Sequence, residues 1–187
     1  MKKALLVDFD DSFTHNIVQE LVVAGFKVDL IHWLDFESLP DTDLLVLGPG
    51  PGQPDDYQRI FSLIEEWLKL KKPLFGVCLG HQLYWRILGE PVYPSKEPLH
   101  GQKVKLELTP EWREWLNLPQ EVWVQRYNSL SVFAQSSTHY PHLRNFIVND
   151  EILITRGEKL LTYQFHPESM GTSFRQRFFG PLLREIV

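Results

Sequence analysis

The chain has 187 residues, which is enough for one domain with a hydrophobic core and short for two. Its hydrophobic fraction of 43% and charged fraction of 23% are typical of a globular protein, and its net charge of -5 offers no basic face for nucleic acid. The single cysteine, Cys78, cannot form an intrachain disulfide, and no apolar run approaches the roughly 20 residues that a membrane span needs.

Strands and helices alternate in the first half of the chain. Asp8, Asp10 and Asp11 interrupt the N-terminal apolar run too early for a signal peptide, so we expect a cytoplasmic protein whose first strand begins almost at once. The hydrophobic pattern predicts strands at residues 3–9, 28–33, 44–47 and 73–77, and helices at 13–24, 57–70 and 79–88. This alternation indicates crossover connections and a parallel sheet, with ligands bound at the carboxyl ends of the strands.

The second half of the chain has a different pattern. Pro91, Pro94 and Pro98 break the alternation, and the strands that follow look antiparallel. They are predicted at residues 103–108, 122–126, 131–134, 146–148, 152–155 and 160–165, with a short helix around Trp112 and Trp115 and a last helix at 173–186. No repeat or linker divides the chain. We therefore expect a single α/β domain, residues 1–187, in which a mostly parallel open sheet has helices on both faces and a small antiparallel sheet beside it.

Cys78 lies at the predicted turn from a strand into a helix, within the sequence GVCLG. This is the G-x-nucleophile-x-G spacing of a nucleophile elbow, with a thiol in place of serine. Gly76 and Gly80 have a steric reason to be there, because side chains two positions from the corner would collide with the flanking strand and helix. We expect a strained Cys78 whose thiol projects into solvent, where the helix N-terminus favours the thiolate. The alternative is an unreactive thiol in the core.

His166 is the best candidate for a base that activates this thiol. It follows a predicted strand in the sequence QFHPE, whereas His81 lies on the first turn of the Cys78 helix and should point away from the sulfur. Pro167 is expected to hold the chain extended, so that Glu168 projects to the same side as His166 and orients its ring. The three side chains would form a Cys-His-Glu triad.

Acyl chemistry on a thiol also needs N–H donors for the oxyanion of the tetrahedral intermediate. The N–H of Leu79, directly after the nucleophile, is one expected donor. The second should come from a neighbouring loop, and the Gly50-Pro51-Gly52 turn fits because glycine leaves its N–H unobstructed. This loop is not a phosphate-binding loop, since no lysine and serine or threonine follow the glycines.

Three of these segments resemble the signature blocks of the class I glutamine amidotransferases with a Cys-His-Glu triad. The blocks are LGPGPG at residues 47–52, GVCLGHQ at 76–82 and QFHPES at 164–169, in the family order and at similar spacing. Within the family, DSFT at 11–14 and RYNSL at 126–130, together with His100-Gly101, most resemble the glutaminase subunits of anthranilate synthase and aminodeoxychorismate synthase. The resemblance spans nearly the whole chain and implies a flavodoxin-like α/β fold.

The resemblance also implies a mechanism and a set of site residues. Cys78 would attack the side-chain amide of glutamine, forming a glutamyl thioester and ammonia, while His166 moves the proton and Glu168 steers the ring. The implied oxyanion donors are Gly50 and Leu79, and the implied glutamine-binding residues are Gly50, Pro51, Gly52, Gln82, Ser129 and Leu130. Ammonia would pass to a synthase subunit that binds chorismate and Mg²⁺. This chain is expected to bind no metal or other cofactor, no nucleic acid and no membrane.

Three segments depart from the family pattern. Asn128 stands where the block before Ser129 usually has histidine, so the side chain keeps its hydrogen-bonding capacity and loses the ability to carry charge. In the opening block, Phe9 or Asp10 and His15 stand where asparagine and tyrosine are usual, and the sequence Asp55-Asp56-Tyr57 replaces residues that are usually small. None of these departures touches the predicted triad. They bear on which synthase the chain serves.

Several functions remain open from the sequence. We prefer the glutaminase subunit of an anthranilate synthase, in tryptophan biosynthesis, and the nearest alternative is the corresponding subunit of an aminodeoxychorismate synthase, in folate biosynthesis. A stand-alone hydrolase with the same triad, such as a γ-glutamyl hydrolase, is disfavoured by Gln82 and His100-Gly101. A regulatory subunit without catalysis is disfavoured by the intact Cys-His-Glu set.

Overall fold

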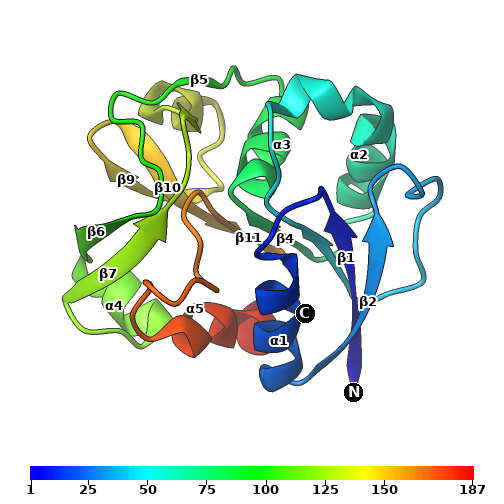
Figure 1. Ribbon diagram of the computed structural model, residues 1–187, viewed down its shortest axis with the longest axis horizontal. Coiled ribbons are helices and arrows are strands. Elements are labelled where there is room, and N and C mark those ends of the chain that lie inside the picture. Colours follow the sequence, from blue (N-terminus) through cyan, green and yellow to red (C-terminus); the bar gives the residue numbers. More distant parts are fainter.

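A computed structural model describes residues 1–187, and its central element is a seven-stranded sheet (Figure 1). The strand order is β2-β1-β3-β4-β11-β10-β9. The strands have the bounds β1 Lys2–Asp8, β2 Phe26–His32, β3 Leu44–Leu47, β4 Leu74–Val77, β9 Arg144–Val148, β10 Glu151–Gly157 and β11 Leu160–Tyr163. The first five strands in this order run parallel, and β10 and β9 continue the sheet antiparallel. The predicted mostly parallel α/β sheet is confirmed.

The prediction for β11 was wrong in its direction. We expected an antiparallel strand, but β11 pairs parallel with β4, and only its other edge pairs antiparallel with β10. The reason is that a strand in the middle of a sheet takes its direction from both neighbours, and β4 lies more than 80 positions earlier in the chain. This pairing brings the carboxyl ends of β4 and β11 together, since Val77 lies opposite Tyr163.

Helices cover both faces of the sheet, as predicted. Helices α1 (Thr14–Val23), α4 (Pro110–Leu116) and α5 (Arg175–Pro181) contribute to the core on one face. Helices α2 (Phe61–Lys69) and α3 (Leu79–Ile87) contribute to the core on the other face, as Figure 1 shows. Side chains alternate between the faces along each strand, so Leu44 and Val46 of β3 enter the first core while Leu45 and Leu47 enter the second. The second core contains two fully buried tryptophans, Trp67 and Trp85.

Each of two predicted helices consists of two segments that differ in helical type. The segment expected at 57–70 begins with a 3-10 helix, η1 (Pro54–Ile60), in which Tyr57 has non-helical dihedral angles, and only then becomes α2. The last helix becomes a π-helix, η3 (Leu182–Ile186), after Pro181. Proline lacks an N–H and its ring crowds the preceding turn, which favours a change of helical geometry at this point.

Two small antiparallel sheets flank the main one. One pairs β6 (Gln102–Glu107) with β7 (Glu121–Arg126), and the other pairs β5 (Tyr93–Pro94) with β8 (Leu130–Ser131). The strand expected at 131–134 is therefore limited to two residues, and a 3-10 helix, η2 (Ala134–His139), begins where it was expected to end. The turn-forming residues of the sequence AQSSTH favour this local geometry over a strand. None of the helices has the length and apolarity needed to cross a membrane.

Candidate active site

Cys78 occupies a strained corner between β4 and α3, as the sequence predicted. Its φ of 52° and ψ of −99° lie in a region that side chains rarely adopt. A Cβ atom on Gly80 would lie 2.1 Å from the carbonyl oxygen of Leu47, and one on Gly76 would lie 2.8 Å from the Gly80 backbone. Gly76 therefore allows β4 and α3 to meet closely at the elbow, and Gly80 allows α3 to pack against the end of β3.

The thiol does not project into solvent, which corrects the expectation from the sequence. Cys78 is only 8% exposed and contributes to the core on one face of the sheet. Its backbone N–H donates to Tyr163 O at 2.8 Å, which draws the corner against the end of β11. The residues that follow β11 then pack around the sulfur, and Gln164 Nε2 lies 3.8 Å from Sγ. Burial of the thiol thus results from a segment that is distant in sequence.

His166 and Glu168 form a close, buried pair. Their Nδ1 and Oε1 atoms are 2.7 Å apart, and the side chains are 2% and 0% exposed. The expected extended geometry around Pro167 was wrong, because Ser169 N donates to His166 O at 3.3 Å and closes a turn. Proline suits the second position of such a turn, so the turn and not the pleat of a strand brings the carboxylate to the ring.

The backbone of His166 is fixed by strand β7. Its N–H donates to Gln125 O at 2.9 Å, and its carbonyl oxygen accepts from Thr172 Oγ1 at 2.7 Å. These contacts come from the small sheet on one side and from the segment before α5 on the other. The main chain of His166 is therefore held from two sides, and the hydrogen bond to Glu168 sets the orientation of the ring.

The electrostatics of the pair favour a positively charged imidazole. Burial lowers the pKa of His166, but the charge of Glu168 and the hydrogen bonds with Cys78 and Glu168 outweigh it, so the pKa lies well above its ordinary value. Glu168 Oε2 is buried and accepts no hydrogen bond, so the carboxylate bonds through Oε1 to the ring of His166. A protonated histidine next to a thiol stabilises the thiolate form.

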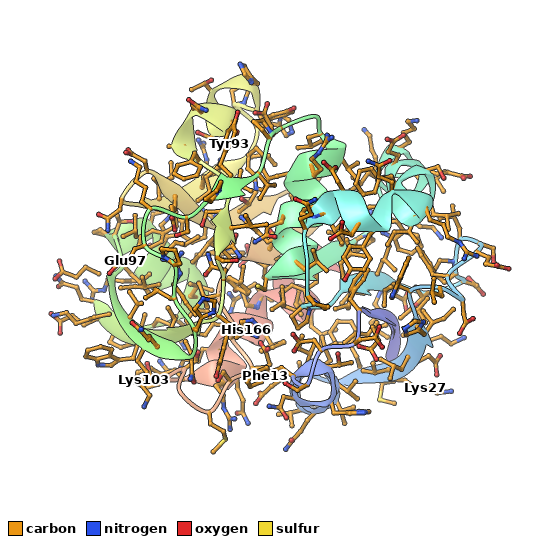
Figure 2. All side chains as sticks on the ribbon, turned by 45° about the horizontal axis from the view of Figure 1, so that its top comes forward. Phe13, Lys27, Tyr93, Glu97, Lys103 and His166 are labelled. Atoms are coloured by element: carbon orange, nitrogen blue, oxygen red, sulfur yellow. The ribbon has the colours of Figure 1, made fainter.

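Phe13 and Tyr127 pack against the ring of His166, and neither was predicted as a site residue. Their ring centroids lie 5.2 Å and 4.9 Å from that of His166 and 5.0 Å from each other. Figure 2 shows Phe13 beside His166. The signal that could have found them is their place within the DSFT and RYNSL segments. Since all three distances are similar, the two aromatic rings lie next to each other on the same side of the imidazole, where they limit its access to water.

The two predicted oxyanion donors come from adjoining segments. A Cβ atom on Gly50 would lie 2.6 Å from Leu79 Cδ2, so the glycine backbone packs directly against the residue after the nucleophile. Gly80 N donates to Gly48 O at 3.1 Å and joins the first turn of α3 to the same loop. Pro51 and Gly52 continue this loop at the surface.

The atypical Asp55-Asp56-Tyr57 segment braces the Gly-Pro loop. Tyr57 Oη donates to Pro51 O at 2.9 Å, and Gln53 N donates to Asp56 Oδ2 at 2.9 Å. Asp55 forms an ion pair with Arg86 of α3 at 2.8 Å. Each of the three unusual side chains thus has a structural partner.

Gln82 connects the thiol region to the predicted glutamine-binding strand. Its Nε2 donates to Leu130 O at 2.9 Å and to Gln164 Oε1 at 3.2 Å. The backbone carbonyl of Ser129 accepts from Ser95 N at 2.9 Å, and its side chain lies in an exposed position. The structure thus brings Gln82, Leu130 and Cys78 into one neighbourhood. Gln164 was missed, although it begins the QFHPES block and lies two residues before His166.

A buried polar network supports the segment that contains Ser129 and Leu130. Arg126 Nη2 lies 2.5 Å from Glu151 Oε2, and Arg126 Nε donates to Asn128 Oδ1 at 3.0 Å. Asn128 Nδ2 in turn donates to Leu130 O at 3.0 Å. A neutral side chain at position 128 can accept from the buried guanidinium without adding a second positive charge. The sequence offered no sign of this network.

Other features of the surface lie apart from the triad. No three His, Cys, Asp or Glu side chains are placed to share a metal ion. The His139-Tyr140-Pro141-His142 segment contributes a hydrogen bond between His139 Nδ1 and Glu90 Oε1 at 2.9 Å. A hollow of about 470 Å³ lies near β5, close to Tyr93 at the top of Figure 2, and contains none of the predicted site residues. Its lining consists of Tyr93, Lys96, Phe133, Ala134, Gln135 and Asp150.

Comparison with known proteins places the chain in a family. The model of the family "Glutamine amidotransferase class-I" matches residues 5–184, so the chain belongs to the class I glutamine amidotransferases. It is 36% identical over 185 residues to "Anthranilate synthase component 2" of Haemophilus influenzae, covering 92% of this chain and 91% of that protein. The protein of the same name from Helicobacter pylori strain J99 is 32% identical, with 91% and 90% covered.

The fold also has solved counterparts. The crystal structure of a glutamine amidotransferase from Thermotoga maritima superimposes with a TM-score of 0.69 at 21% identity, covering 98% of this chain and 83% of that one. A structural likeness at this level of identity concerns the fold alone. The expected class I amidotransferase fold is confirmed.

Proposed function

We propose that this amidotransferase hydrolyses glutamine through Cys78, His166 and Glu168 and delivers the ammonia to a chorismate-using synthase subunit of the anthranilate synthase type. The observation that carries the proposal is the position of His166, whose ring pairs with Glu168 at 2.7 Å and whose pKa is raised by both Glu168 and the thiol at the elbow. The names of the relatives support the choice of synthase, since both are anthranilate synthase components. The proposal assigns chorismate and Mg²⁺ to the partner subunit.

The first half of the proposed reaction releases ammonia. The Cys78 thiolate attacks the amide carbon of glutamine, and the carbonyl oxygen becomes an oxyanion next to the N–H groups of Gly50 and Leu79. The His166 imidazolium then donates its proton to the amide nitrogen, the C–N bond breaks and ammonia leaves. A glutamyl thioester on Cys78 and a neutral imidazole remain.

The second half regenerates the enzyme. Neutral His166 removes a proton from water, the resulting hydroxide attacks the thioester carbonyl, and the C–S bond breaks to release glutamate and the thiolate. Glu168 is not consumed in either half. It stabilises the imidazolium and holds the ring orientation, as the acid of a triad does.

The glutamine-binding residues belong to the same proposal. Gly50, Pro51 and Gly52 would contact one end of the substrate, and Gln82, Ser129 and Leu130 the other. The Gln82 amide already uses both N–H groups within the protein, on Leu130 O and Gln164 Oε1. Its Oε1 is therefore the atom left for the substrate, and an oxygen acceptor suits the ammonium group of glutamine.

The test combines Cys78→Ser and His166→Ala with a histidine control. Each variant is assayed for ammonia release from glutamine with the copurified large subunit present, because glutaminase subunits can be nearly silent alone. Both should lose activity by about 10³-fold or more. His142→Ala, in an exposed loop, should retain it. Ammonia release by a folded Cys78→Ser variant at the wild-type rate would contradict the proposal.

A product assay decides the pathway. The complex is supplied with glutamine and chorismate, and anthranilate and aminodeoxychorismate are measured separately. We expect anthranilate. Formation of aminodeoxychorismate instead would place the chain in the other synthase while leaving the glutaminase mechanism intact.

A further inference from the structure

The side chain of Gln164 is a buried polar group that the triad mechanism does not use. It follows β11 directly, is 0% exposed, and its Nε2 atom lies 3.8 Å from Cys78 Sγ. The sulfur is the reacting atom of the proposed nucleophile. A neutral N–H that faces this sulfur can therefore influence its chemistry.

The orientation of this amide follows from the groups around it. Amide oxygen and nitrogen have nearly the same shape, so their positions must be inferred from donors and acceptors of known type. The carbonyl oxygen of Leu130 can only accept, and so Gln82 must present its NH₂ group to it. The same NH₂ group has a second N–H that reaches Gln164, and Gln164 must therefore present its oxygen.

One consequence is that Gln164 has only its NH₂ group to turn toward the sulfur. A flip of its amide would set two NH₂ groups against each other at Gln82 and would place an oxygen against the thiolate. Both changes are unfavourable inside a protein. The chain of bonds from Leu130 through Gln82 and Gln164 thus determines which atom Cys78 meets.

We infer that Gln164 is a further catalytic residue, a neutral hydrogen-bond donor that stabilises the Cys78 thiolate and keeps Sγ in place for attack. This inference rests on the proposed glutaminase function and deepens it. A hydrogen bond to the charged form of a group favours that form. The donor adds no charge to the site, so it acts without competing with His166 for Glu168.

The expected signature has two opposite parts. Loss of the donor lowers the fraction of Cys78 that is thiolate at low pH. The thiolate that remains is more nucleophilic, because the logarithm of its rate constant rises by about half a unit for each unit by which the acidity of the thiol falls. For a tenfold change in acidity, alkylation should slow by about threefold where the thiol is mostly protonated and quicken by about threefold where it is fully ionised. A structural change that merely opens the site would accelerate the reaction at every pH.

The charged groups around the thiol are the same in the variants. His166 and, behind it, Glu168 face Cys78 from the segment after β11. From α3, His81 points to Thr162 at 2.8 Å, and burial lowers its pKa to about 3, so it is neutral throughout the range used. A change in the pH curve can then be assigned to the amide.

The experiment measures the rate at which iodoacetamide alkylates Cys78, the only cysteine, in the full chain between pH 5 and pH 10. Gln164→Leu removes the donor at similar size, and Gln164→Met removes it while leaving a thioether that can accept from Gln82. Gln135→Leu, at an exposed position in η2, is the control. The midpoint of the rate curve should move up by about one pH unit in the two Gln164 variants and stay unchanged in the control.

Two outcomes would overturn the inference: a midpoint within 0.2 pH units (roughly the precision of such curves) of the wild type in either folded Gln164 variant, or acceleration at all pH values. Folding is verified by thermal unfolding before alkylation, and the Met variant is used if the Leu variant does not fold. Alkylation requires no glutamine turnover. A shifted curve in an enzyme that releases no ammonia would uphold the role of Gln164 toward the thiol and refute the glutaminase proposal separately.

Discussion

Replacing Glu151 by glutamine tests the buried ion pair behind the predicted glutamine-binding strand. The carboxylate lies 2.5 Å from both Arg126 Nη2 and Ser95 Oγ, and the two charged side chains are 6% and 3% exposed. Removing one charge of a buried pair leaves the other uncompensated, which costs about 3–5 kcal/mol. Each kcal/mol moves the Tm of a domain of this size by roughly 2–4 °C, so Glu151→Gln should lower the Tm by roughly 6–20 °C.

The loss should depend on pH in a defined direction. Burial raises the pKa of Glu151, but the hydrogen bonds from Ser95 and Arg126 and the charge of Arg126 outweigh it, so the pKa lies below its ordinary value. A pKa that is lower in the folded than in the unfolded protein means that the contribution is complete above about pH 4.5 and is lost as the pH falls below it. The wild type and the variant should therefore converge in stability under acidic conditions.

The assay measures the free energy of unfolding in urea at pH 7 and at successively lower pH. Arg126→Met and the double variant complete a double-mutant cycle with Glu151→Gln. The two single changes should each cost several kcal/mol and the double variant less than their sum, because no uncompensated charge remains. Asp150→Asn is the matched control, since the neighbouring Lys96–Asp150 pair is 57% and 70% exposed and should contribute less than about 1 kcal/mol. A loss below about 1 kcal/mol in Glu151→Gln, or additive effects in the cycle, would refute this reasoning.

Two further predictions concern the elbow and the triad. Gly80→Ala should destabilise the fold by about 3 kcal/mol or more, because its Cβ would lie 2.1 Å from Leu47 O, whereas Gly180→Ala in α5 has nothing within 4 Å and should be neutral or slightly stabilising in thermal unfolding. Glu168→Gln should lower the pKa of His166, which NMR titration of the ring would detect, and should slow glutamine hydrolysis by about 10²-fold or more. An unchanged ring titration in that variant would contradict the proposed coupling.

Much of the first half of the fold could be predicted because its information is local. The strand at Leu44–Leu47 has the predicted bounds, and β1, β2 and α1 differ from prediction by no more than two residues at each end. The elbow was predictable in part for the same reason, since Gly76 is required by a collision with the backbone of Gly80 in the same turn, whereas Gly80 is required by a collision with Leu47 of the distant strand β3. The second half was less predictable, because short strands in small sheets depend on partners elsewhere in the chain.

The His166–Glu168 contact shows how a correct residue pair can follow from the wrong geometry. The spacing of two residues predicted the contact, and the structure contains it at 2.7 Å. The expected reason was an extended chain, but Pro167 and Glu168 form a turn closed by Ser169. Both geometries bring residues two apart within reach, so the spacing alone could not distinguish them.

The sequence by itself determined the elements whose constraints lie within a few residues: the glycine-flanked corner at Cys78, the amphipathic helices and the spacing of two residues that pairs His166 with Glu168. Only the tertiary structure decided that β11 lies parallel to β4 and that the thiol is enclosed. It also decided the amide chain through Gln82 and Gln164 and the Arg126–Glu151 pair. The physical reason is that hydrogen bonding and burial depend on which distant segments come together, and a local pattern carries no record of that partner.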